Sequence, residues 1–178
     1  AQAIRATHRG EIEKAAEALS QAQKLTDSLM QELQNYPQIL YAGYTQDAVK
    51  EYVEAAISYS LIFQAPLPSP QSLNVGYDTY LLGLAEANGE LRRHCLDILR
   101  HGYSEKAENI MNIMDDIYSI LITMDYPDAV TGGLRRLTDL ARGINERTRG
   151  EITIILRESQ LEEKLSSLSK EIQNASVP

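Results

Sequence analysis

The amino-acid sequence predicts an all-α fold. Long stretches carry apolar residues at a spacing of three or four positions, and no stretch shows the alternation of a β-strand. All six prolines fall outside these stretches. A chain of 178 residues with 43% hydrophobic residues can bury a sizeable core, so we expect one domain over residues 1–178.

Five helical segments follow from this periodicity, with turns between them. The predicted segments are residues 2–35, about 39–63, about 77–101, about 104–125 and 134–173. The first segment carries an apolar seam with three-then-four spacing, made of Ile12, Ala15, Leu19, Ala22, Thr26, Leu29 and Leu33.

Proline, glycine and one serine set the predicted boundaries. Pro37 interrupts the first segment, and three alternating prolines make residues 64–76 a loop. Ser104 is a suitable N-cap for the fourth segment, which closes before Pro127. An interruption of the last segment near Gly143 or Gly150 remains an open alternative.

The end of the last segment repeats apolar residues at four-three-four spacing: Leu161, Leu165, Leu168 and Ile172. The repeat is shorter than the three or four heptads of a secure coiled coil. Two interpretations stay open, a helix that packs on its own bundle and a contact with another subunit.

Charge and cysteine content exclude some classes of protein. With 17 Lys and Arg against 25 Asp and Glu, the net charge of −8 excludes a uniformly basic nucleic-acid binder, although a local basic patch is compatible with it. Cys95 is the only cysteine, which excludes an intrachain disulfide and suits a core position. No apolar run is long enough for a membrane span, and the polar N-terminus argues against a signal peptide, so we expect a cytoplasmic protein.

Two acidic pairs are the main candidates for chemistry. Glu51 and Glu54 are three residues apart, and Glu86 and Glu90 four apart, so each pair lies on one helical face. Like charges at this spacing repel, and oxygen ligands favour a hard divalent cation such as Mg²⁺ or Mn²⁺. A solvated surface is the alternative for either pair alone.

Basic residues are the candidates for nucleic-acid contacts. Arg135, Arg142 and Arg149 are seven apart and share one stripe, with Arg136 beside it. Arginine suits phosphate, but i,i+4 pairs with acids on a solvated face explain the stripe equally well. The further candidates are Arg5, His8, Arg9, Arg93 and His94. His94 follows Glu90 by one turn. It is a candidate metal ligand, a hydrogen-bond donor to a metal-binding residue or a phosphate contact, or a histidine without a role.

Three sequence segments resemble the translin family, and most closely translin-associated factor X. They are Glu51-Tyr-Val-Glu-Ala55, Tyr80-Leu-Leu-Gly-Leu-Ala-Glu86 and Gly89-Glu-Leu-Arg-Arg-His-Cys95. The resemblance is strongest over residues 47–100 and weaker over 134–157. It implies about seven helices in one α-superhelical bundle and a hollow octamer that encloses nucleic acid. We expect a prokaryotic, archaeal homologue that forms a homo-octamer.

By position, Glu51, Glu54, Glu86 and Glu90 fall on the catalytic acids of the family, although the family typically has Asp where Glu86 stands. The resemblance implies a metal-dependent endoribonuclease that cleaves single-stranded RNA, with one or two Mg²⁺ or Mn²⁺ ions held by these acids. Attack by metal-activated water predicts 5′-phosphate and 3′-hydroxyl ends. Duplex RNA and single-stranded DNA are further candidate partners.

Two other functions stay open at this point. One is a non-catalytic shell that binds single-stranded DNA or RNA, for which the arginines matter more than the acids. The other is a helical scaffold that only mediates subunit contacts.

Overall fold

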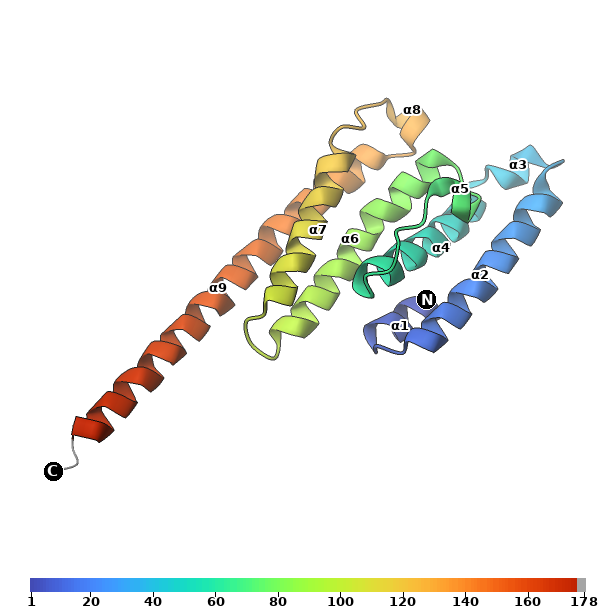
Figure 1. The fold of residues 1–178 in the computed structure, drawn as a ribbon. Helices are drawn as coiled ribbons and strands as arrows, with labels where there is room; N and C mark the ends of the chain where they lie inside the picture. The colour runs from blue at the N-terminus through green and yellow to red at the C-terminus, as the bar shows by residue number, and fades with distance from the viewer. Residues whose placement is uncertain (176–178) are drawn as a thin grey trace.

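The computed structural model describes residues 1–175 and confirms the all-α class, since no strand occurs within them. The described residues form nine helices (Figure 1), two more than the resemblance implies. Their bounds are α1 (Gln2–His8), α2 (Ile12–Leu33), α3 (Pro37–Leu40), α4 (Gly43–Ile62), α5 (Pro70–Leu73), α6 (Tyr77–Leu99), α7 (Glu105–Leu121), α8 (Asp128–Thr131) and α9 (Leu134–Ala175).

The higher count comes mainly from single helical turns at the predicted boundaries. The helices α3, α5 and α8 are four residues long, and a proline stands at or just before the start of each. Proline suits the first helical turn because its missing N–H would have no partner there. The predicted cap at Ser104 is confirmed, since its hydroxyl accepts a hydrogen bond from the Lys106 amide.

The first predicted segment is two helices. Gly10 adopts a φ of +71°, which glycine tolerates, and the chain reverses there so that α1 packs against both α2 and α4. Residues 2–35 otherwise follow a helical pattern, and one glycine within them was too weak a signal for the break. The predicted seam of α2 is only partly used, since Ile12 is 51% exposed whereas Ala15 is fully buried.

The core lies around α6, which packs against α4, α7 and α9 (Figure 1). Its fully buried side chains come from four helices and include Val53, Ile57, Leu91, Met114 and Leu134. Removing a side chain of this size from water contributes about 1.5–3 kcal/mol.

A buried polar connection fixes α9 against α6 and α7. The Asn88 side-chain amide donates to Asn145 Oδ1 at 2.8 Å, and Asn145 donates to the Met114 carbonyl at 2.9 Å. Arg92 adds hydrogen bonds to Thr148 and Glu151. Because hydrogen bonds are directional, these contacts set the rotation of α9 and so decide which of its residues face α4.

The helix α9 runs unbroken through Gly143 and Gly150, and its C-terminal half projects beyond the bundle (Figure 1). Leu161, Leu165 and Leu168 are 53–57% exposed, so this half does not pack on its own bundle. No helix within residues 1–175 is long and apolar enough to cross a membrane.

Candidate functional site

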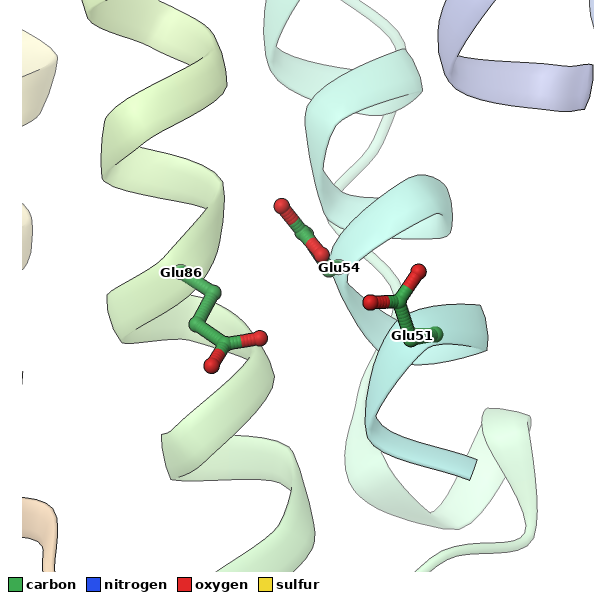
Figure 2. A group of neighbouring side chains, drawn as sticks. All are labelled: Glu51, Glu54 and Glu86. Carbon is green, nitrogen blue, oxygen red and sulfur yellow. The ribbon is translucent and has the colours of Figure 1, made fainter. Parts of the chain in front are cut away.

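Three of the four predicted acids meet between α4 and α6. One carboxylate oxygen each from Glu51, Glu54 and Glu86 lies within 4.8 Å of the other two. Figure 2 shows Glu86 extending from α6 toward Glu51 and Glu54 on α4. We call these three residues the acid trio. Such a donor set could hold a hard divalent cation, because all its donors are oxygens on two fixed helices.

A glycine on α6 allows the two helices to come this close. A Cβ atom built on Gly83 would lie 2.6 Å from Val53 Cγ1 and 3.2 Å from the Glu54 amide nitrogen. Gly83 lies one turn before Glu86, so the close approach is made next to the trio. A glycine within the apolar run Leu81–Leu84 is the sequence signal for this contact.

Gly89, the other glycine of α6, has a different setting. A Cβ on Gly89 would meet no atom within 4 Å, and the residue lines an open groove beside the trio. The groove has a volume of about 410 Å³. Its walls come from α4, α6 and the first turns of α9, which contribute Glu51, Glu54, Glu86, Arg136 and Leu140 among others.

Negative charge in the acid trio is only partly balanced. Burial and the neighbouring Glu86, Glu51 and Glu90 carboxylates raise the pKa of Glu54 to about 7, while Lys50 opposes the rise. Glu54 is only 9% exposed, so water screens its repulsion by the neighbouring carboxylates weakly. A site that disfavours its own ionised carboxylate fits a bound cation well.

Lys50 is a member of the site that the sequence patterns did not single out. Its Nζ lies 2.9 Å from Glu86 Oε1 and 3.3 Å from Asp47 Oδ1. The bonds to Glu86 and Asp47 raise its pKa although burial opposes this, so it is an ammonium ion at neutral pH. A lysine directly before Glu51 gives no local sign that it would reach across to α6.

The fourth acid, Glu90, lies outside the trio in this structure. Its carboxylate is hydrogen-bonded to His8 Nε2 of α1 and lies 3.9 Å from Arg93 Nη1. The hydrogen bond from His8, followed by the charges nearby, lowers the pKa of Glu90 although burial opposes the shift. Glu90 therefore has its own partners, His8 and Arg93, whereas the ion-pair partner of the trio is Lys50.

The two histidines predicted to contact nucleic acid, His8 and His94, lie next to Glu90. The His8 side chain is only 4% exposed, and its Nδ1 is buried without a hydrogen-bond partner. The His94 ring centroid lies 6.4 Å from that of His8, and burial, together with the charge of His8, lowers the pKa of His94. Within this chain, His8 is placed to orient Glu90 rather than to present its ring at the surface.

Solved structures of known proteins share this fold. AfC3PO from Archaeoglobus, a translin-family protein, matches with a TM-score of 0.79 and 31% identity, over 88% of this chain and 81% of that one. The chain belongs to the translin family. A second AfC3PO structure, a complex with duplex RNA, matches with a TM-score of 0.80 and 32% identity over the same shares of the two chains.

Two further proteins are similar to this chain, one in fold and one in sequence. Apo-NeC3PO from Nematostella shares the fold at a TM-score of 0.77 and 24% identity, over 85% of this chain and 78% of that one. The uncharacterized protein MJ0175 of Methanocaldococcus jannaschii is 35% identical over 126 residues, which is 70% of this chain. The chain spans only 56% of the length of MJ0175. No family model matches the chain.

The predicted arginine stripe of this translin-family chain does not face the groove as a unit. Arg149 binds both oxygens of Asp115 on α7, at 2.8 and 2.7 Å. Arg142 pairs with Glu146 at 3.0 Å, as the solvated-face interpretation anticipated. Arg135 is exposed, and it is Arg136, beside the stripe, that lines the groove at the acid trio.

The other predicted cations are distributed over α1 and α6. Arg5 and Arg9 line a shallow depression together with Glu11 and Glu17, and it shares no residue with the groove. Arg93 is 57% exposed and accompanies Glu90. The cationic residues that the structure places with the acid trio are therefore Lys50, bonded to Glu86, and Arg136, on the groove wall.

Proposed function

We propose that this translin-family chain is a metal-dependent endoribonuclease that cleaves single-stranded RNA inside a hollow homo-octamer and that also binds duplex RNA. The observation that carries the proposal is the acid trio, in which Glu51, Glu54 and Glu86 converge on an open groove, in a family of which one member is solved with duplex RNA. The raised pKa of Glu54 supports it, because it reports negative charge that a cation would balance.

Glu51, Glu54 and Glu86 would hold Mg²⁺ or Mn²⁺. When bound, such an ion lowers the pKa of water and neutralises charge on a phosphodiester. Before Glu90 can serve as a further ligand, it has to release His8, to which its carboxylate is bonded. Arg136 would hold a backbone phosphate at the groove, because it lines the groove and its guanidinium matches phosphate geometry.

Binding of RNA and self-association are part of the same proposal. The AfC3PO complex with duplex RNA supports RNA as the ligand class. The exposed Leu161, Leu165 and Leu168 on the projecting half of α9 support self-association, since an apolar row of this kind is a typical helix-pairing surface.

A nucleic-acid-binding shell without cleavage is the second candidate. The observation that favours it is the exposure of Arg135, Arg136 and Arg147 on α9, for which no acidic partner occurs among the described residues. Such a shell would bind RNA or single-stranded DNA without metal and lose affinity steeply with salt. It would depend on these arginines more than on Glu51.

The deciding experiment is cleavage of end-labelled single-stranded RNA by the purified chain. The assay compares Mg²⁺ or Mn²⁺ with EDTA, and wild type with Glu51→Gln. We expect metal-dependent cleavage that leaves 5′-phosphate ends and that Glu51→Gln lowers by about a thousandfold without changing assembly. Cleavage that survives EDTA or the substitution would refute the metal-site mechanism, and salt-sensitive binding with no cleavage would favour the shell.

A further inference from the structure

Lys50 has an unusual place among the lysines of the chain. Its side chain is 18% exposed, and its ammonium bonds Glu86 across the α4–α6 contact and Asp47 one turn back on α4. By contrast, the side chain of Lys14, which pairs with Glu11, is 73% exposed. Fixing this long, flexible side chain costs rotamer entropy, which its ion pairs have to offset. The bond to Glu86 is therefore part of the architecture of the site.

Within residues 1–175, Lys50 is the one Lys or Arg that forms an ion pair with a member of the acid trio. Arg93 and His8 are both engaged with Glu90. One ammonium ion therefore faces three carboxylates that lie within 4.8 Å of one another.

The bond of Lys50 also engages a carboxylate that a metal ion would use. Glu86 Oε1 accepts from Lys50 Nζ at 2.9 Å, and Glu86 is the single member of the trio on α6. A cation held between the two helices needs this carboxylate, and the positive charge of Lys50 repels that cation at short range. Asp47 remains available to Lys50 when Glu86 is withdrawn.

We propose that Lys50 is the resident counter-ion of the acid trio and that it sets the affinity for the divalent cation. This inference rests on the proposed function, since it concerns the same metal site. In the metal-free chain Lys50 balances part of the charge and holds α4 to α6 through Glu86. Binding of a divalent cation transfers Glu86 from the ammonium to the metal, and Lys50 keeps its bond to Asp47. The ammonium thus weakens metal binding while it stabilises the metal-free site.

The test is calorimetric titration of the full chain with MnCl₂ at pH 7.5 without RNA, with free Mn²⁺ measured by electron paramagnetic resonance. The variants are Lys50→Met, which keeps the stem without the charge, and Lys50→Arg, which keeps the charge. Lys164→Met, at an exposed position on the projecting half of α9, is the matched control.

We expect Lys50→Met to lower the dissociation constant for Mn²⁺ about tenfold. Lys50→Arg and Lys164→Met should stay near the wild-type value. Lys50→Met should also lower the melting temperature without metal. Adding Mn²⁺ should then raise the melting temperature of Lys50→Met by more than it raises that of wild type. If Lys50→Met fails to fold, Lys50→Gln gives the same comparison.

The outcomes separate this inference from the proposed function. Wild-type binding with an unchanged or larger dissociation constant in Lys50→Met would overturn the counter-ion role and leave the metal site in place. A lower melting temperature of Lys50→Met that Mn²⁺ does not restore would also overturn the counter-ion role, because Lys50 would then only bridge α4 and α6. If neither wild type nor Lys50→Met binds Mn²⁺, the metal site itself is refuted and the inference with it.

Discussion

Glu54 and Glu90 are both glutamates on the packed helices α4 and α6, but their pKa values are shifted in opposite directions. Glu54 lies among acids with little compensation, and burial, then the neighbouring carboxylates, raise its pKa to about 7. Glu90 has the partners His8 and Arg93, and its pKa is lowered. Burial opposes ionisation of both acids, more strongly at Glu54, which is the more buried of the two. Only Glu90 has a hydrogen-bond partner that reverses the shift, so the difference teaches that burial and local partners together decide whether an acid is satisfied or available for a cation.

The largest expected effect is on metal affinity, which should depend on the acid trio much more than on Glu90. Glu86→Gln removes a trio carboxylate and should weaken Mn²⁺ binding by about 100-fold, whereas Glu90→Gln should weaken it less than about tenfold. Calorimetric titration of both variants measures this. Equal losses would show that Glu90 leaves His8 and joins the trio, which would remove the contrast between the two sites.

The contrast also predicts opposite pH dependences of stability. The folded-state pKa of Glu54 is raised, so its contribution is complete below about 4.5 and is lost as pH rises through about 7, by up to about 3 kcal/mol. The lowered pKa of Glu90 gives a contribution that is complete above about 4.5 and is lost as pH falls through the folded-state value.

Urea unfolding without metal measures both effects, with each variant compared with wild type at each pH. Glu54→Gln should gain stability relative to wild type between pH 5 and pH 8. Glu90→Gln should lose more stability at pH 7 than at pH 3.5. Parallel pH profiles for the two variants would contradict the assigned partners.

Two glycines of α6 offer a matched test of the helix contact that forms the site. Gly83→Ala would place a methyl group against Val53 and should cost about 1–3 kcal/mol while weakening Mn²⁺ binding. Gly89→Ala meets open space and should stabilise the helix by up to about 1 kcal/mol. Thermal melts and metal titration of both variants check this, and equal destabilisation would exclude Gly83 as the point of close approach.

Much of this fold follows from the sequence. The long helices, the proline-marked boundaries and the Ser104 cap depend on neighbours within a few residues, which local patterns report. The break at Gly10 was missed because a positive φ at one glycine leaves the apolar spacing on either side intact.

The site was only partly predictable, for a related reason. Spacing within α4 and within α6 places each acid pair on one face, but the partners of each acid lie far away in sequence. The bond between His8 and Glu90 spans 82 positions, and the bond between Lys50 and Glu86 joins two helices across a loop. Such contacts depend on how helices rotate against one another, which a single sequence does not encode locally.

The smallest expected effect concerns which arginine meets RNA. Arg136 lines the groove whereas Arg142 is paired with Glu146, so Arg136→Met should weaken single-stranded RNA binding about threefold to tenfold and Arg142→Met much less. Fluorescence anisotropy in a Glu51→Gln background measures binding without cleavage. A larger loss with Arg142→Met would place the RNA on the solvated face of α9 instead of the groove.

The central claim is that the acid trio holds a divalent metal ion, and anomalous scattering from crystals grown with Mn²⁺ tests it most directly. We predict an anomalous peak between α4 and α6, about 2.2 Å from one oxygen each of Glu51, Glu54 and Glu86. Lys50 Nζ should then be withdrawn from Glu86 toward Asp47. A peak elsewhere, or none at millimolar Mn²⁺ with Lys50 still bonded to Glu86, would contradict the account.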